Sequence, residues 1–141
     1  MKSLSCLFLL IMCCSFLTLN SKTFAQVEPA MYFCDRYDEY DGEIGVKDRF
    51  YTGPITVMVK CDYALNLTDS KIQYDRYNFR SGKFEYYKSF DFDVSADMKY
   101  IYFSPTSGNS MEFDDTGFYR VFLLDHDGKT VASSLVEIIN Y

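Results

Sequence analysis

Hydrophobic and polar residues alternate along several stretches of the chain. Within residues 55–63, Ile55, Val57 and Val59 lie on one side together with Cys61 and Tyr63, and the residues between them are mostly polar. Alternation with a period of two is typical of a β-strand with one buried face. The pattern therefore predicts a strand over residues 55–63 in which Cys61 points inward.

Two further stretches, residues 71–79 and 83–92, flank the turn Arg80–Gly82 and predict a β-hairpin. Gly82 can adopt the positive φ that a tight turn needs. Shorter strands are expected at residues 31–34, 43–46 and 98–103, and residues 104–110 form a loop rich in Ser, Pro, Gly and Asn.

The strongest hairpin signal lies near the C-terminus. Residues 117–124 and 130–139 are rich in β-forming residues, and the Asp127–Gly128 pair between them is typical of a hairpin turn because both residues accept left-handed conformations. In the last strand, the side that carries Glu137 is expected to face solvent, which leaves Ala132, Val136 and Ile138 in the core.

Composition supports an all-β chain, since 13 Tyr and 13 Phe favour pleated, half-buried surfaces and Trp is absent. About seven short strands separated by turn residues predict one antiparallel β-sandwich, with a small barrel as the alternative.

The N-terminus predicts export. Lys2 is followed by uncharged, mostly apolar residues 3–21, and the small residues Thr23 and Ala25 suit cleavage after Ala25. The expected division is a signal peptide over 1–25 and a β-sandwich domain over 26–141, in a secreted or periplasmic protein. An uncleaved membrane anchor is the alternative, because the uncharged stretch approaches the roughly 20 residues of a membrane-spanning helix. No span is expected after residue 25.

The chain is acidic, with a formal charge of −6 that becomes −8 when Lys2 and Lys22 leave with the signal peptide. Such a charge disfavours nucleic acids and anionic membranes. Cys34 and Cys61 are the cysteines that remain, and export predicts a disulfide between them, with two free thiols as the alternative.

The residues Asp115, Gly117 and Tyr119 resemble the tyrosine corner of immunoglobulin-like sandwiches, and the run from Asp114 to Ile139 is similar to the ends of bacterial extracellular modules of that type. The resemblance implies that the Tyr119 hydroxyl bonds the backbone of the preceding loop. Gly117 would allow the close corner and Asp115 would bond the turn. The cysteine of antibody domains is missing, because position 121 is Val.

Catalysis has little support in the sequence. The single histidine, His126, lies in the predicted surface turn, and no spacing of carboxylates selects a catalytic pair. The acidic segment Cys34–Gly45 fails the calcium-loop pattern because Tyr37 falls at the first ligand position and Asp48 at the last. We expect that segment to be a solvated loop, with partner binding or calcium binding as alternatives. No cofactor and no metal are expected.

Tyrosines and arginine in exposed segments suit contact surfaces, because large amphipathic rings bury area at small entropic cost. The candidate contact residues are Tyr37, Tyr40, Tyr77, Arg80, Tyr86 and Tyr87. The alternative is that these aromatic side chains only form stabilising cross-strand pairs. The sequence predicts a non-enzymatic binding or structural module with a protein or glycan partner. An acidic inhibitor of a basic secreted enzyme and a small carboxylate-based hydrolase are the alternative functions.

Overall fold

The computed structural model describes residues 28–105 and 111–141, which form strands and no helix. The strands are β1 (Ala30–Cys34), β2 (Arg36–Asp38), β3 (Gly42–Ile44), β4 (Arg49–Tyr51), β5 (Thr56–Lys60), β6 (Asp69–Asn78), β7 (Lys83–Asp93), β8 (Tyr100–Phe103), β9 (Gly117–Leu124) and β10 (Thr130–Ile139). The all-β prediction is confirmed. The described residues contain ten strands rather than about seven, because three-residue strands such as β2, β3 and β4 are too short to show alternation.

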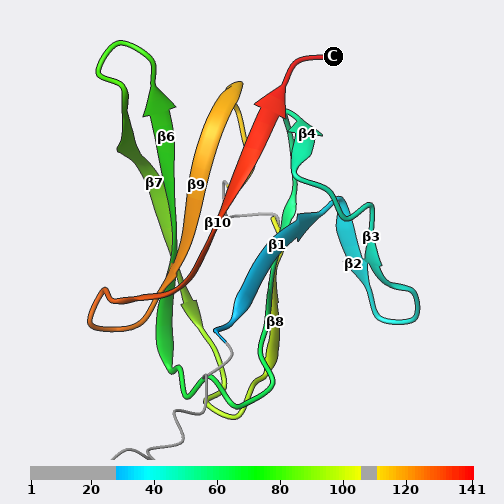
Figure 1. Ribbon diagram of the computed structural model, residues 1–141. Coiled ribbons are helices and arrows are strands. Elements are labelled where there is room, and N and C mark those ends of the chain that lie inside the picture. The colour runs from blue at the N-terminus through cyan, green and yellow to red at the C-terminus, as the bar shows by residue number, and fades with distance from the viewer. Residues whose placement is uncertain (1–27, 106–110) are drawn as a thin grey trace, which may run out of the picture.

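The strands form two main sheets that face each other (Figure 1). One has the order β1-β5-β8 and the other the order β4-β10-β9-β6-β7. The strands β2 and β3 make a separate two-stranded hairpin that projects to the side of the three-stranded sheet (Figure 1). The β6–β7 hairpin reaches beyond the rest of its sheet at the opposite side of the molecule.

Side chains from the inner faces of both sheets form one hydrophobic core. In β10, Ala132, Val136 and Ile138 are buried, as the alternation predicted. In β9, which pairs with β10 over its whole length, Tyr119 and Val121 are buried on the same inner face. The regular alternation of buried and accessible residues follows from the pleat of each strand.

One pair of strands departs from the predicted antiparallel arrangement. The short strand β4 pairs in parallel with the end of β10, with Glu137 opposite Arg49 and Ile139 opposite Tyr51. The chain then passes through residues 52–55 and enters β5 in the other sheet. The parallel pairing arises because the chain pairs briefly with β10 and then crosses to the other sheet. Local alternation of residues does not reveal such a change of sheet.

The strand β5 is buried on both faces, whereas the sequence predicted one buried face. Thr56 and Met58 are as inaccessible as the residues that point into the core, yet Met58 lies outside the core cluster. On its outer side, the β2–β3 hairpin packs against the three-stranded sheet, and Tyr37 stacks on Tyr102 with ring centroids 4.4 Å apart. The acidic segment that was predicted to be a solvated loop is thus a hairpin that covers part of a sheet.

Both predicted turns contain a glycine with positive φ, at 68° for Gly82 and 77° for Gly128. The expectation that Asp127 also adopts a left-handed conformation is wrong, because Asn66 is the only non-glycine residue with positive φ in the described ranges. The Asp125 carboxylate instead closes this turn by accepting hydrogen bonds from the backbone N–H groups of Asp127 and Lys129 at 3.0 and 2.8 Å. With these bonds the four residues Asp125–Gly128 form the turn, in place of the predicted pair Asp127–Gly128.

The predicted signal peptide, residues 1–25, lies outside the described residues, and so do residues 106–110 of the predicted loop. Across residues 28–105 and 111–141, the structure contains no apolar helix of membrane-spanning length.

The predicted disulfide is wrong, because both cysteines are free. Cys34 lies opposite Thr56 in the β1–β5 pair, whereas Cys61 follows Lys60, which lies opposite Ala30. The cysteines are therefore five steps apart along β5, which amounts to about 17 Å at about 3.4 Å per residue. A disulfide requires Cα atoms within about 7 Å of each other. The two cysteines occupy opposite ends of one strand pair, and they cannot be bridged without unpairing it.

Candidate contact surfaces

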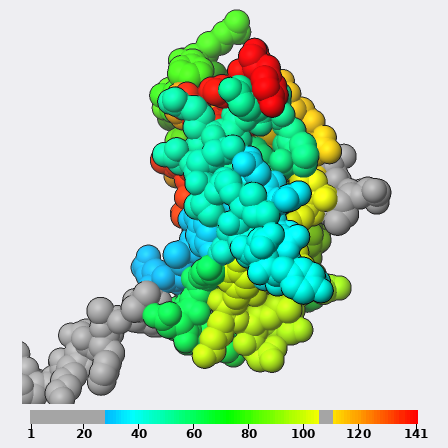
Figure 2. Space-filling view, turned by 90° about the vertical axis from the view of Figure 1, so that its right-hand side faces the viewer, coloured from blue at the N-terminus to red at the C-terminus, as the bar shows by residue number. Residues whose placement is uncertain are grey.

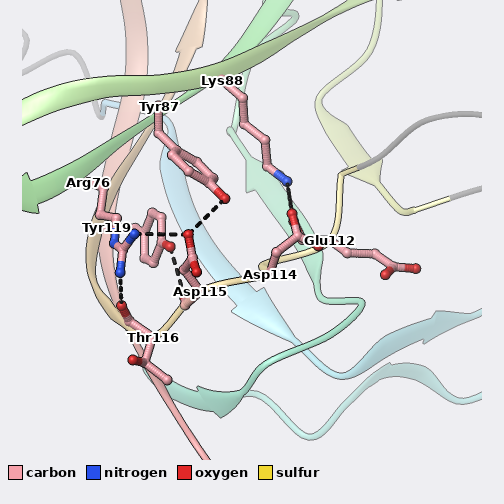
Figure 3. A network of polar contacts seen from close by, with 8 residues as sticks. All are labelled: Arg76, Tyr87, Lys88, Glu112, Asp114, Asp115, Thr116 and Tyr119. Atoms are coloured by element: carbon pink, nitrogen blue, oxygen red, sulfur yellow. Dashed lines mark hydrogen bonds and ion pairs between the residues drawn. The ribbon is translucent and has the colours of Figure 1, made fainter.

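The segment before β9 is tied to β6 and β7 by a network of polar contacts (Figure 3). Arg76 donates to the Asp115 carboxylate at 2.9 Å and to the Thr116 carbonyl at 2.7 Å. The Tyr87 hydroxyl also donates to the Asp115 carboxylate, at 3.3 Å, and the Lys88 ammonium pairs with Asp114 at 3.0 Å. These contacts fix the segment as it enters β9, which in turn fixes the end of the sandwich beside the β6–β7 hairpin.

Within this network, Tyr119 is fully buried and its hydroxyl donates to the Asp115 carbonyl oxygen at 2.8 Å. Burial raises the pKa of Tyr119, so the hydroxyl stays protonated and remains a donor. Gly117 has φ of 143°, and a Cβ added there would lie 3.4 Å from the Arg76 side chain. Within the described residues, the Asp115 carboxylate accepts hydrogen bonds from Arg76 and Tyr87 rather than from its own turn.

The sequence did not single out Tyr74, which holds the same segment further upstream. Its ring is fully buried and stacks on Phe113 with centroids 4.6 Å apart, and its hydroxyl donates to the Met111 carbonyl at 3.2 Å. Tyr74 lies in an alternating strand that contains several aromatic residues. Alternation predicts which of them are buried, but it does not indicate which distant segment they contact. Its role depends on residues 37 positions away in the sequence.

The outer face of the five-stranded sheet carries an exposed group of aromatic and apolar side chains, which we call the aromatic face. Its members come from β6, β7, β9 and β10 and the adjacent turn, and they are Tyr77, Phe79, Phe84, Tyr86, Phe118, Phe122 and Leu135. Tyr77 contacts Phe79 and Phe84 edge-on at 5.1 and 5.2 Å, and Phe79 contacts Phe118 at 6.4 Å. The aromatic face is therefore contiguous across three strands.

Several members of the aromatic face are strongly exposed. Phe79 is 73% exposed, Tyr86 65%, Leu135 57% and Phe118 44%. Single apolar side chains on a surface are ordinary, but contiguous ones usually mark an interaction site. Cross-strand pairing was the alternative for these aromatics, and it accounts for Tyr77 with Phe84. It leaves the exposure of the other four unexplained.

Three ion pairs link neighbouring strands within and beside the aromatic face. Arg120 lies at its centre, with its guanidinium 4.9 Å from the Phe84 ring and 4.8 Å from the Phe122 ring, and it pairs with Asp75 at 3.8 Å. The other two pairs are Arg49 with Glu137 at 2.5 Å and Lys71 with Asp91 at 3.4 Å. These pairs leave little net charge at a surface of an otherwise acidic protein.

Four of the predicted contact residues, Tyr77, Arg80, Tyr86 and Tyr87, meet at one place. They line a hollow of about 510 Å³ beside the β6–β7 turn, together with other residues of 76–80 and 85–87 and with Thr116 and Gly117. We call this the hairpin hollow. Arg80 and Lys83 are exposed at its turn, and neither has an ion pair with the residues that the structure describes.

The other two predicted contact residues, Tyr37 and Tyr40, lie on the β2–β3 hairpin, which forms part of the side of the molecule shown in Figure 2. Tyr40 is 96% exposed at the turn, whereas Tyr37 is half-buried between the rings of Tyr100 and Tyr102. The six residues therefore belong to two separate surfaces. Tyr37 anchors its hairpin to the sheet, and Tyr40 is free for contact.

The β2–β3 hairpin is also held by Glu43. Its carboxylate accepts a hydrogen bond from the Tyr32 hydroxyl at 2.5 Å and forms an ion pair with Lys60. The hydrogen bonds from Lys60 and Tyr32 lower the pKa of Glu43 to about 2. Beneath the hairpin, burial raises the pKa of the Cys34 thiol to about 11, so this cysteine is unreactive at neutral pH.

Chemistry-bearing residues are dispersed in the described part of the chain. His126 is exposed in the β9–β10 turn, where its ring lies 3.2 Å from the Asp127 carboxylate. Among residues 28–105 and 111–141, no three His, Cys, Asp or Glu side chains are arranged so that they could hold a metal ion.

Comparison with known proteins gives structural similarity but no sequence match. No protein family model matches the chain, and no curated protein matches it. Among solved structures, the chain is similar to an immunoglobulin-like protein from Pseudomonas aeruginosa, with 11% sequence identity and a TM-score of 0.45. The match covers 82% of this chain and 99% of the other. A similarity at this level does not assign the chain to a family.

Proposed function

We propose that this protein is an exported, non-enzymatic binding module that contacts a protein partner through the aromatic face. The exposure of Phe79, Tyr86, Phe118 and Leu135 on one contiguous surface carries the proposal. Burial of such a surface against a partner releases about 25 cal/mol for each Å² of apolar area. The rings contribute contact area at low entropic cost, which is why aromatic residues are enriched in binding hot spots.

A protein partner suits the aromatic face better than a glycan does. The face combines aliphatic Leu135 with phenylalanines, and its central Arg120 is engaged by Asp75 and two rings. It therefore offers few free hydrogen-bonding groups for sugar hydroxyls. Protein interfaces, in contrast, have an apolar centre with a polar rim, and the pairs Arg49–Glu137 and Lys71–Asp91 border the face in that way.

Two further assignments accompany this proposal. The uncharged stretch 3–21 and the small residues before Gln26 support export through a cleaved signal peptide. The hydrogen bond from Tyr119 to the Asp115 carbonyl supports a tyrosine corner, in which a buried hydroxyl satisfies the backbone of the preceding loop.

The proposal is tested by capturing partners with the exported protein from the envelope of its source organism. The variant Phe118→Thr/Leu135→Thr removes two apolar side chains from β9 and β10 while keeping β-forming residues. Val46→Thr is the matched control, because Val46 is 57% exposed, like Leu135, and is not part of the face.

We expect wild type and Val46→Thr to retain the same partner, and the double variant to retain at least tenfold less of it. All three proteins should show the same thermal unfolding, since the changed side chains lie outside the core. Equal retention by the three proteins, or no retained protein at all, would refute the proposal.

A further inference from the structure

The two exposed hairpin ends of the molecule carry opposite charge. The turn between β2 and β3 presents Asp38, Glu39 and Asp41 around the fully projecting ring of Tyr40. Asp38 accepts hydrogen bonds from the backbone N–H groups of Tyr40 and Asp41 at 2.9 and 3.1 Å, which holds the turn in one shape. We call residues 38–42 the acidic tip. It is a preformed protrusion with one aromatic ring at its end.

The hairpin hollow has the complementary properties. Arg80 lines the hollow and Lys83 lies in the adjacent turn, and neither is ion-paired within the described residues; the rings of Phe79, Tyr86 and Tyr87 provide apolar walls. Glu85 also lines the hollow, where Asn78 and Ser81 donate hydrogen bonds to its carboxylate. The hollow's volume of about 510 Å³ lies within the range of about 300–1,000 Å³ that is typical of ligand pockets, and it is ample for one tyrosine side chain. The end of the β6–β7 hairpin, residues 76–87, carries Arg76, Arg80 and Lys83 against Glu85, so it is net positive on a chain with a formal charge of −6.

From these complementary features we infer that the protein associates with itself head to tail, with the acidic tip of one copy seated in the hairpin hollow of the next. Tyr40 would enter the hollow and stack on its aromatic walls, while Glu39 and Asp41 meet Arg80 and Lys83. The same chain presents an acidic protrusion with an aromatic ring and a hairpin end with a positive excess and an aromatic hollow, so two copies match in charge and shape.

The positions of the two features decide the type of assembly. The β2–β3 and β6–β7 hairpins lie on opposite sides of the molecule (Figure 1), so one copy cannot satisfy its own hollow. A contact between two different surfaces is heterologous, and it leaves one tip and one hollow free at the ends of every dimer. The association therefore extends into chains and does not stop at a closed pair.

The contact is small, because a tip of five residues buries less than the roughly 1,200–2,000 Å² of a stable interface. We therefore expect weak association that becomes visible at high protein concentration. Exposed charges carry part of it, so it should be stronger in about 20 mM salt than in about 500 mM salt, where screening is nearly complete over a few ångströms. Tyr77, Phe79 and Tyr86 belong both to the aromatic face and to the hollow, whereas Phe118 and Leu135 do not line the hollow and remain available for another partner.

The test uses two charge-reversed variants of the exported protein in sedimentation velocity. The tip variant is Glu39→Lys/Asp41→Lys, and the hollow variant is Arg80→Glu/Lys83→Glu. All four positions are exposed, so both variants should fold. Wild type should form concentration-dependent oligomers, and each variant alone should self-associate at least tenfold more weakly, because its tip and its hollow then carry the same charge.

Mixing the two variants should restore association, because the positive tip of the tip variant meets the negative hollow of the hollow variant. Restoration upon mixing requires two different contact surfaces. The control pair, Asp62→Lys/Asp97→Lys and Lys99→Glu/Lys129→Glu, changes net charge equally at other exposed positions. Each control protein alone should associate like wild type, apart from a general effect of net charge.

Three results would overturn the inference: a wild type that is monomeric at all concentrations, variants that associate like wild type, or variants that do not recover upon mixing. A dimer that Phe118→Thr/Leu135→Thr abolishes and charge reversal leaves intact would show pairing through the aromatic face instead. Loss of partner capture by the double Thr variant, with self-association unchanged, would separate this inference from the proposed function.

Discussion

Replacement of Tyr119 by Phe tests how the segment before β9 is stabilised. The ring is fully buried, and it contacts Phe113 and Tyr87 at centroid distances of 5.1 and 5.6 Å. Phenylalanine keeps these ring contacts and removes only the hydroxyl, which donates to the Asp115 carbonyl at 2.8 Å. The Asp115 carbonyl then loses this donor in a partly buried hydrogen bond, which should lower the free energy of unfolding by about 1–3 kcal/mol.

Tyr87→Phe is the matched control, since it makes the same chemical change in the neighbouring ring. The Tyr87 hydroxyl donates at 3.3 Å to the Asp115 carboxylate, which is exposed and already bonded by Arg76 at 2.9 Å. Water can replace this hydroxyl, so the loss should stay within about 0.5 kcal/mol. The difference between the two variants isolates burial of the acceptor as the cause.

The assay is equilibrium unfolding in urea followed by circular dichroism, with thermal unfolding as a second measurement. At about 4 °C for each kcal/mol in a domain of this size, Tyr119→Phe should lower Tm by about 4–12 °C. The slope of the unfolding free energy against urea concentration should not change, because unfolding exposes the same surface area in both proteins. A loss below about 0.5 kcal/mol in Tyr119→Phe, or an equal loss in Tyr87→Phe, would refute this reasoning.

The remaining predictions concern the β2–β3 hairpin. Because the pKa of Glu43 is lowered from 4.5 to about 2, the stabilisation that its carboxylate provides is complete above about pH 4.5 and is lost as the pH falls through 2. NMR signals of residues 36–44 should show that the hairpin is more stable in wild type than in Glu43→Gln, and that this difference in stability shrinks as the pH falls across that window. A difference that stays constant with pH would contradict the prediction. Thiol labelling at pH 8 should modify Cys61 at least tenfold faster than the buried Cys34, and Glu43→Gln should increase the labelling rate of Cys34 alone. Equal labelling rates of the two cysteines in wild type would show that the hairpin does not cover Cys34. Gly45→Ala should destabilise more than Gly42→Ala in urea unfolding, because both have φ near 72° but only at Gly45 would the new Cβ meet the Asp35 carboxylate, at 1.9 Å; equal losses would mean that Asp35 moves away freely.

Local patterns in the sequence predicted the strands well where one face of a strand is buried. The bounds of β9 and β10 coincide with the predicted ranges 117–124 and 130–139, and Ala132, Val136 and Ile138 point inward as expected. The turn glycine Gly82 was also recognised correctly. Alternation and turn chemistry depend on neighbouring residues, so they can be read without knowing the partner strand.

The contact residues were predicted only in part, since Tyr77, Arg80, Tyr86 and Tyr87 do share a hollow, whereas Tyr37 is used to anchor the β2–β3 hairpin. Phe118 was missed as a surface residue because β9 reads as a core strand. Leu135 lies on the Glu137 side of β10, which was expected to face solvent, but it was not recognised as a contact residue. Each strand of a sheet has two faces, and the outer one becomes an interaction surface only when neighbouring strands align similar side chains on it.

The sequence by itself determined that this is a β protein, where its best-patterned strands begin and end, and which side of the last strand is buried. Tertiary structure alone decided that Cys34 and Cys61 lie at opposite ends of a strand pair, that β4 runs parallel to β10, and that aromatic residues from three strands and Leu135 from a fourth form one face. The reason is physical: alternation sets the direction of each side chain, but strand pairing and register depend on contacts between residues far apart in the chain.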